Sequence, residues 1–273
     1  MSDESTVSVV LPTYGRPEYF EEAVDSVASQ TYSAVELVVV DDCSPEPVAP
    51  LLDEVDTGNV DVTVVRHEEN RGACAARNTG IEEASGAYVA FIDDDDVWLE
   101  SKLEHQVRVM ESSGPAVGAV YTGQRHVNDG ETTNVRAPTT SGDVTAAILQ
   151  GASLNPFSCM LVDAAVVEAA GPLDMRFPSW QDREWYFRLS THCKFAAIPE
   201  PLVVRRMGHE QISGDYETKR DVSYPLLLEK HRGLAREYGC EDEFLAYLTR
   251  SLAGSALQSG RYGAAVRHAL DAL

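Results

Sequence analysis

The chain has few basic residues and very little lysine. Its 273 residues include 44 acidic against 22 basic side chains, which gives a formal net charge of −22, and only four of the basic residues are lysines (102, 194, 219 and 230). A protein that binds nucleic acid needs a basic face to neutralise phosphates. This balance therefore excludes nucleic acid as the main partner.

The acidic side chains are scattered among regularly spaced apolar residues, unlike those of a disordered acidic tail. At molar salt the Debye length shrinks to ~3 Å, so the mutual repulsion of such charges is screened. Abundant scattered acid with scarce lysine therefore predicts a protein from a halophilic archaeon. This expectation concerns solubility and leaves the activity open.

Long apolar runs, a secretory leader and cysteine pairs are also missing. No apolar run reaches the ~20 residues that a membrane-spanning helix needs, and the acidic N-terminus leads directly into a strand pattern. The five cysteines form no C-x-x-C pair and no cluster with zinc-ligand spacing, which favours reduced thiols. We expect a soluble cytoplasmic protein without structural zinc. Peripheral association with the cytoplasmic face of a membrane remains compatible with this composition.

The apolar segments of the first half predict an α/β fold. Strand patterns at residues 6–11, 35–40, 60–66 and 88–92 alternate with helical patterns at 18–30, 48–55 and 73–84. Such alternation predicts a mostly parallel central sheet flanked by helices. Neither G-x-G-x-x-G nor G-x-x-x-x-G-K-[ST] follows the first strand, so neither a dinucleotide site nor a P-loop is indicated.

The second half is less regular. We expect strands at 117–122, 159–162, 195–198 and 202–206, a loop over 128–142, short helices at 144–150 and 164–170, and a helix within 179–189. From residue 221 onward the pattern is that of amphipathic helices. The sequence therefore predicts a catalytic-type α/β domain over 1–220 and a small helical C-terminal extension over 221–273.

Ligand-capable side chains follow three of the predicted strands of the first half. They stand at 12–16, at Asp41 and Asp42, and in the run of four aspartates at 93–96. Ligands of open α/β sheets bind beyond the carboxyl ends of the strands, and crowded carboxylates favour a divalent cation. This placement predicts a divalent-metal site for a phosphate-bearing ligand. The alternative is that an acid-rich chain has placed some of its acid in turns.

Five motifs in this order resemble those of the family 2 glycosyltransferases. They are VVLPTYGR at 9–16, VVVDDCS at 38–44, NRGACAARNTG at 70–80, GAYVAFIDDDD at 86–96 and WQDREWYFRL at 180–189. The resemblance covers residues 6 to 215 approximately. It implies the Rossmann-like, nucleotide-sugar-binding glycosyltransferase A fold and transfer of a sugar with inversion.

The resemblance also implies a donor site. Asp42 would accept the imide hydrogen of uracil, which favours a uridine nucleotide, while Asp41 would be a structural partner at the strand end. For Arg71 and Arg77, salt bridges to the abundant acid explain the residues as well as contact with the diphosphate does. The residues implied to bind the nucleotide sugar are Pro12, Thr13, Arg16, Asp42, Arg71, Arg77, Asp93 and Asp94.

In the acidic run, the Asp-x-Asp motif of the family falls on Asp93 and Asp95. The resemblance implies that Asp95 binds Mn²⁺ or Mg²⁺, which take phosphate oxygens and water as their other ligands. His209 resembles a histidine that some members use on the metal or the diphosphate, although a lone loop histidine is more often a surface residue. We expect Asp96 to cap the helix that follows it.

Asp182 matches the catalytic base of the family. The attacking hydroxyl of the acceptor needs a carboxylate within hydrogen-bond reach to remove its proton. The residue before it, Gln181, stands where the family more often has Glu, and Asp182 could instead be a helix N-cap. Trp180, Trp185 and Tyr186 could line the acceptor pocket, although aromatic residues at this spacing more often belong to the core.

These observations predict a metal-dependent inverting transferase that moves a sugar from a UDP-sugar to a hydroxyl acceptor. The acceptor could be a lipid-linked glycan used for surface glycoproteins or polysaccharides. One alternative is a nucleotidyltransferase that makes nucleotide sugars, which should carry a Gly-rich, Lys-bearing loop after the first strand. The other is a non-catalytic module that binds nucleotide sugars. The sequence leaves the oligomeric state open.

Overall fold

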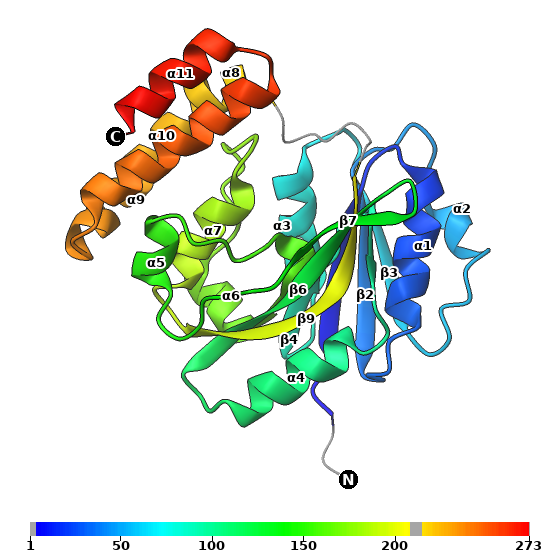
Figure 1. The fold of residues 1–273 in the computed structure, drawn as a ribbon. Helices are drawn as coiled ribbons and strands as arrows, with labels where there is room; N and C mark the ends of the chain where they lie inside the picture. Colours follow the sequence, from blue (N-terminus) through cyan, green and yellow to red (C-terminus); the bar gives the residue numbers. More distant parts are fainter. Residues whose placement is uncertain (1–3, 208–214, 273) are drawn as a thin grey trace.

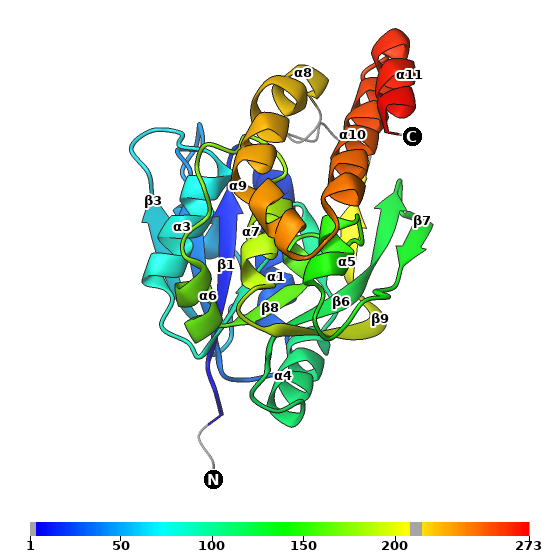
Figure 2. The same cartoon turned by 90° about the vertical axis from the view of Figure 1, so that its left-hand side faces the viewer.

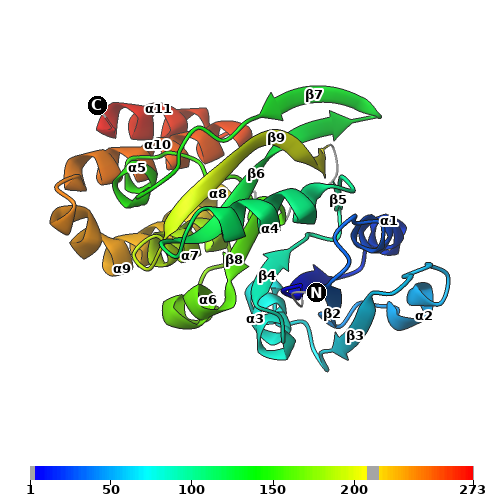
Figure 3. The same cartoon turned by 90° about the horizontal axis from the view of Figure 1, so that it is seen from below.

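A curved sheet forms the centre of the protein, with helices on both of its faces (Figure 1). The computed structural model describes residues 4–207 and 215–272. Among these residues the strands run in the order β3-β2-β1-β4-β8-β6-β9-β5, and β7 pairs with β6. Seen from below, the sheet curls from β3 round to β9 (Figure 3).

The first half of the sheet is parallel, as the alternation of strands and helices predicts. It comprises β1 (Val7–Thr13), β2 (Val35–Asp41), β3 (Asp61–Arg66) and β4 (Tyr88–Phe91). Successive side chains of a strand point to opposite faces. Val9 and Val10 are both fully buried and belong to two different apolar clusters, one on each face. The continuous apolar runs of β1, β2 and β4 thus reflect burial on both sides, whereas β3, at the edge of the sheet, is exposed or half-buried along its length.

The second half of the sheet is mixed. Here β8 (Met160–Asp163) pairs antiparallel with both β4 and β6 (Val117–Asn128), whereas β6 and β9 (Lys194–Arg206) are parallel. The two short strand patterns predicted at 195–198 and 202–206 form one continuous strand, β9.

The expectation of a loop over 128–142 is wrong in part, because β7 (Glu131–Arg136) turns back against β6. Asp129 and Gly130 both have positive φ, 49° and 80°, as a two-residue hairpin turn of type I′ requires. All six residues of β7 are exposed and mostly polar, so no apolar alternation marks the strand.

The segment after the acidic run also differs from its prediction. Residues 96–98 form a short strand, β5 (Asp96–Trp98), which pairs antiparallel with β9, and α4 (Lys102–Ser112) begins only after it. Trp98 is buried and donates its indole N–H to the Ser158 carbonyl over 2.9 Å. Asp96 is therefore a strand residue, and its expected role as helix cap is wrong.

Two layers of helices cover the sheet. α1 (Pro17–Ala28), α2 (Ala49–Leu52) and α4 contribute to the cluster that contains Val9. The opposite face carries α3 (Ala73–Glu83), α5 (Thr145–Leu149), α6 (Ala164–Ala170) and α7 (Gln181–Leu189), whose buried side chains join the cluster that contains Val10. A 3₁₀ turn, Phe157–Cys159, precedes β8.

The C-terminal helices lie against α5 and α7 rather than against the sheet (Figure 2). After the short helix α8 (Tyr216–Thr218) and a π-helical turn (Lys219–Ser223) come α9 (Tyr224–Glu237), α10 (Glu241–Gln258) and α11 (Tyr262–Asp271). Phe244 of α10 is fully buried, and its ring centroid lies 5.8 Å from that of Phe187 in α7. The apolar core therefore continues from α7 into these helices. Among the described residues no helix is long and apolar enough to cross a bilayer.

Candidate active site

The turn after β1 contacts the acidic run directly. Thr13 is buried, and its hydroxyl donates to Asp94 Oδ2 over 2.8 Å. The guanidinium of Arg16 lies 2.5 Å from Asp95 Oδ2 and 3.4 Å from Asp94 Oδ1. Gly15 has φ 66°, which only glycine adopts freely, and this turn brings Arg16 back over the strand ends. The β1 turn and the acidic run thus form one charged surface.

The two aspartates at the end of β2 have different surroundings. Asp41 accepts hydrogen bonds from the backbone N–H of Ser44 (2.8 Å) and Val48 (3.3 Å) and from the Arg66 guanidinium. Burial raises the pKa of its carboxyl, but these hydrogen bonds outweigh burial and leave the pKa below its ordinary value. Asp41 therefore holds the turn after β2 in place.

Asp42 holds the chain that leads into α3. Its Oδ1 accepts the Arg71 N–H over 2.9 Å and lies 2.7 Å from His67 Nδ1, and its Oδ2 accepts the Gly72 N–H over 2.7 Å. A carboxylate oxygen can accept two hydrogen bonds. Oδ2 can therefore take a further donor from the cavity that Asp42 lines.

Each of the first three aspartates of the acidic run meets a different partner. Asp93 pairs with the Arg77 guanidinium at 2.5 Å, Asp94 accepts from Thr13, and Asp95 pairs with Arg16. Burial raises the pKa of Asp94 to about 6, although the Arg16 charge and the Thr13 hydroxyl both lower it. The arginines thus offset part of the repulsion within the run.

Asp96 is 1% exposed, and neither of its carboxylate oxygens accepts a hydrogen bond of ordinary geometry from a described residue, although the Ser158 hydroxyl lies close enough to lower its pKa. Burial, followed by the charges of Asp93 and Asp95, raises its pKa well above the ordinary range. One oxygen each of Asp93, Asp95 and Asp96 lies within 4.8 Å of the other two. Three hard oxygen donors at this separation, one of them buried without a hydrogen bond of ordinary geometry, fit a divalent cation such as Mg²⁺ or Mn²⁺.

The start of α7 faces the same aspartates. Trp180 has φ 61° and occupies the N-cap position, so Asp182 lies inside the first turn, and its alternative role as N-cap is wrong. Arg77, 6% exposed, donates to Gln181 over 3.3 Å while pairing with Asp93. This arginine therefore connects the acidic run with the helix that carries Asp182.

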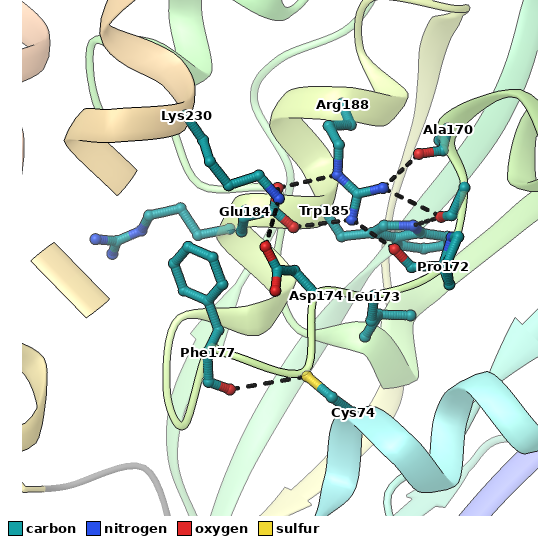
Figure 4. Close-up of polar contacts among 12 residues, drawn as sticks. Cys74, Ala170, Pro172, Leu173, Asp174, Phe177, Glu184, Trp185, Arg188 and Lys230 are labelled. Atoms are coloured by element: carbon teal, nitrogen blue, oxygen red, sulfur yellow. Dashed lines mark hydrogen bonds and ion pairs between the residues drawn. The ribbon is translucent and has the colours of Figure 1, made fainter. Parts of the chain in front are cut away.

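A buried ion cluster positions α7 from its other side (Figure 4). Glu184, 1% exposed, accepts hydrogen bonds from Arg188 at 2.9 and 2.8 Å, and lies 2.8 Å from Lys230 Nζ and 3.1 Å from His231 Nε2. Lys230 also reaches Asp174 at 2.7 Å. Since Lys230 and His231 belong to α9, the C-terminal helices fix the helix that bears Asp182.

The predicted site residues that the structure describes all line one cavity of about 1130 Å³. They are Pro12, Thr13, Arg16, Asp42, Arg71, Arg77, Asp93, Asp94, Asp95 and Asp182. His209 lies outside the described residues. Of the aromatic candidates, Trp180 and Tyr186 line the cavity, whereas Trp185 is 0% exposed and belongs to the core.

Several cavity residues were not predicted from the sequence. They come from β6, β7, β9 and the C-terminal helices and include Gln124, Arg136, Arg205, Lys219 and Tyr247. None of them stands in a motif, and they reach the cavity only because the sheet curls and α10 folds back over α5 and α7. The buried carboxylate of Asp96 was missed for a related reason, since its place depends on pairing with β9.

Known proteins resemble parts of this chain in sequence. Residues 8–169 match the model of glycosyl transferase family 2. Glycosyltransferase TuaG of Bacillus subtilis is 42% identical over 104 residues, 38% of this chain and 41% of that protein. The Escherichia coli glucosyltransferase WfgD, which is named for UDP-Glc as donor and α-D-GlcNAc-diphosphoundecaprenol as acceptor, is 35% identical over 108 residues, 40% of this chain and 42% of that protein. The matches thus span less than half of each of these two relatives.

Solved structures share the fold. TarS 1–349 of S. aureus in complex with UDP-GlcNAc superposes with a TM-score of 0.65 at 16% identity, over 98% of this chain and 89% of that one. The mannosyltransferase PcManGT of Pyrobaculum calidifontis, in complex with GDP-Man and Mn²⁺, also gives 0.65 at 19% identity, over 98% and 74%. At these identities the likeness concerns the fold alone.

Proposed function

Because this chain belongs to glycosyl transferase family 2, we propose that it transfers a sugar from a nucleotide sugar, a UDP-sugar in the first instance, to an acceptor hydroxyl with inversion. One observation carries the proposal. The ends of β1, β2 and β4 and the first turn of α7 present Thr13, Asp42, the acidic run and Asp182 to one cavity. A nucleotide sugar needs hydrogen-bond acceptors for its base, cations for its diphosphate and a base on the acceptor side. Asp42 supplies the acceptor and Asp182 the base, and the arginines Arg16, Arg71 and Arg77, which line the same cavity, supply the cations.

On the donor side, Asp42 accepts the imide N–H of uracil through Oδ2, and Thr13 and the Pro12 backbone border the nucleoside. Arg71, an exposed residue that lines the cavity, contacts the diphosphate. Arg16 and Arg77 neutralise the acidic run and move toward the diphosphate when it binds. Such exchange of partners is feasible because Arg16 is only partly buried.

Asp93, Asp95 and Asp96 would hold Mn²⁺ or Mg²⁺, with Asp95 and Asp93 nearest the donor. When bound, the cation supplies positive charge to the phosphate oxygens as the nucleoside diphosphate departs. Asp94 orients the donor sugar or ribose from its place beside Thr13. His209 remains a candidate ligand of the metal or of the diphosphate.

On the acceptor side, Asp182 accepts the proton of the attacking hydroxyl. The acceptor oxygen forms a bond to the anomeric carbon from the face opposite the diphosphate. The bond from the anomeric carbon to the diphosphate oxygen breaks at the same time, and the nucleoside diphosphate leaves with the electron pair. A single displacement of this kind inverts the configuration at the anomeric carbon.

The acceptor of the proposed reaction is a lipid-linked glycan at the cytoplasmic face of the membrane. WfgD is named for an acceptor sugar carried on diphosphoundecaprenol, which supports a lipid-linked acceptor here. Transfer to soluble sugars with none to a polyprenyl-diphosphate-linked sugar would contradict it.

The proposal is tested by titrating the protein in molar KCl with UDP, GDP, CMP and TDP, each with and without Mn²⁺. We expect a Mn²⁺-dependent rise in thermal stability with UDP, since a ligand at ~100 times its Kd adds about 2.7 kcal/mol. UDP-sugars that bind are then offered with hydroxyl acceptors, and transfer separates an enzyme from a non-catalytic binder. Absence of binding by every nucleotide would overturn the proposal, and preference for another nucleotide would reassign the donor.

A further inference from the structure

Beside Asp182 the cavity is bounded by residues from the start of α7 and from the C-terminal helices, which together we call the wall. This wall includes Trp180 and Arg183 at the start of α7, Lys219 in the π-helical turn and Tyr247 of α10. Asp182 lies close to both groups of residues, since its charge acts on Arg77 beside the acidic run and on Lys219 in the wall, whereas the donor is proposed to bind at the strand ends. The wall is therefore on the side from which an acceptor would approach.

Arg183 is held in place, yet one of its donors is unused. Its guanidinium carbon lies 4.6 Å from the ring centroid of Trp180 and 4.6 Å from that of Tyr247. Contacts of this kind with aromatic rings hold the plane of an arginine without using its N–H groups. Nη1 is buried and has no hydrogen-bond partner among the described residues. A buried donor without a partner is destabilising, and a ligand that accepts its hydrogen bond recovers this loss.

Lys219 is a second cation in the same wall. It is 7% exposed, and its Nζ donates to the neutral hydroxyl of Ser255 over 3.2 Å. Burial and the charge of Arg183 lower its pKa, and the charges of Asp182 and Asp215 act in the opposite direction. Two cations thus share a largely enclosed space, and within residues 4–207 and 215–272 neither forms an ion pair with a carboxylate.

The chain has twice as many acidic as basic residues, so counter-ions are available to the cations of this cavity. Three of its other arginines use them: Arg16 pairs with Asp95, Arg77 with Asp93 and Arg176 with Asp174, whereas within the described residues Arg71, Arg136 and Arg205 form no such pair. The charges of Asp182 and Asp215 act on Lys219, but neither carboxylate forms an ion pair with it. An anionic ligand would supply the missing charge.

We propose that Arg183 and Lys219 form an acceptor subsite for an oxyanion, a phosphate or a carboxylate, placed next to the hydroxyl that Asp182 deprotonates. The inference rests on the proposed function and narrows its acceptor to an anionic sugar or sugar phosphate. A protein of net charge −22 repels such an acceptor over most of its surface. A buried lysine and a half-buried arginine beside the base offset this repulsion at the point of reaction and fix the orientation of the acceptor.

The test separates the subsite from the donor site. With the donor site saturated by UDP and Mn²⁺ in constant KCl, the protein is titrated calorimetrically with glucose 1-phosphate, glucuronate and methyl glucoside. We expect at least one of the two anionic probes to bind at least tenfold more tightly than the neutral glucoside. The phosphate and carboxylate arms then identify the class of anion.

Variants assign the binding to these residues. Arg183→Gln and Lys219→Gln should each raise the Kd of the anionic probe at least tenfold. Arg183→Lys, which keeps the charge, should lose less affinity than Arg183→Gln. Arg250→Gln is the matched control, because Arg250 is exposed on the same helix as Tyr247 and does not line the cavity. Lys219→Gln leaves the aromatic contacts of Arg183 intact, so it reports on the subsite even if Arg183→Gln disturbs the fold.

Three results would overturn the inference: no binding of either anionic probe, equal binding of the neutral glucoside, or unchanged binding by both glutamine variants. A failure of the proposed function has a different signature, since UDP itself would then not bind. The UDP titration of each variant, performed first, therefore distinguishes the two.

Discussion

Arg77 Nη2 lies 2.5 Å from Asp93 Oδ1, and the same guanidinium donates to Gln181 at the start of α7 over 3.3 Å. One buried arginine thus spans the two halves of the cavity, the acidic run on the donor side and the helix of Asp182 on the other. The Arg77 guanidinium also lies over the Phe157 ring, with 4.4 Å between its carbon and the ring centroid. Its removal should therefore affect stability as well as ligand binding.

Arg77→Met should lower the free energy of unfolding by about 2–3 kcal/mol. Breaking a fully buried pair costs roughly 3–5 kcal/mol, and the loss here is smaller because Asp93 is 28% exposed and regains water. Urea unfolding measures the change. Arg108→Met is the control, since Arg108 is exposed on α4 and its loss should stay within about 0.5 kcal/mol. Equal losses for the two variants would show that the ion pair contributes nothing.

Asp95→Asn should remove the Mn²⁺-dependent part of UDP binding, with the Kd for UDP rising about tenfold or more in the presence of the ion. The amide keeps the size of the side chain but takes away its charge. Isothermal titration with and without Mn²⁺ measures the effect, and Asp25→Asn, exposed on α1, controls for the change in net charge. If the variant retains the full Mn²⁺ dependence, Asp95 is not a ligand of the metal.

Asp182→Asn should lower turnover by about 10²–10⁴-fold, the usual contribution of a general base. Because Asp182 is proposed to act on the acceptor, the Kd for UDP should change little by comparison. Initial rates at saturating donor, together with a UDP titration, separate the two effects. Turnover close to that of the wild-type protein would remove the role of base from Asp182.

The free energy of unfolding should decrease as the pH is lowered through the range in which Glu184 takes up a proton. Burial raises the pKa of Glu184, but hydrogen bonds from His231, Arg188 and Lys230 outweigh it and leave the pKa at about 2. Because the folded-state pKa lies below the ordinary value of 4.5, the stabilisation is present above pH 4.5 and is lost as the pH falls toward 2.

Glu184→Gln should therefore be less stable than the wild-type protein at neutral pH by roughly 3 kcal/mol, the order given by a shift of this size. The difference should narrow between pH 4.5 and 2. Chemical unfolding at a series of pH values measures it, with Glu168→Gln, exposed on α6, as control. A difference that is independent of pH would point to packing rather than charge.

Molar salt should stabilise the folded protein. The net charge of −22 is spread over a folded surface, and its repulsion is relieved when the Debye length falls to ~3 Å. Between about 0.1 M and about 2 M KCl we expect the free energy of unfolding to rise by at least ~2 kcal/mol. A stability that is flat or falls over this range would contradict adaptation of the surface to salt.

The sequence was most informative where local pattern and structure coincide. The parallel strands β1, β2 and β4 are buried on both faces, so their continuous apolar runs mark them, and the polar residues at their ends mark the cavity. The five motifs indicated the same fold. Each of these signals lies within a short stretch of chain.

Features that depend on contacts between segments far apart in the sequence could not be predicted from local patterns. β5 looked like the first turn of a helix, because its apolar residues Val97 and Trp98 continue the spacing of α4. β7 has no apolar side toward a core, although the Asp129-Gly130 pair was a usable turn signal. Two partners of Glu184, Lys230 and His231, come from α9, and the unpaired cations of the wall come together only once α10 is in place.

The pairing of β5 has a consequence for synthesis on the ribosome. Asp96, the last residue of the acidic run, is the first residue of β5, yet within the described chain the partner of this strand is β9, at 194–206. The nascent chain must therefore grow by about a hundred residues after Asp96 before this strand can be paired. We therefore expect the carboxylate cluster to form only after β9 has paired with β5. A stalled or cleaved chain that lacks β9 would keep β1 to β4 but could not assemble the cation site.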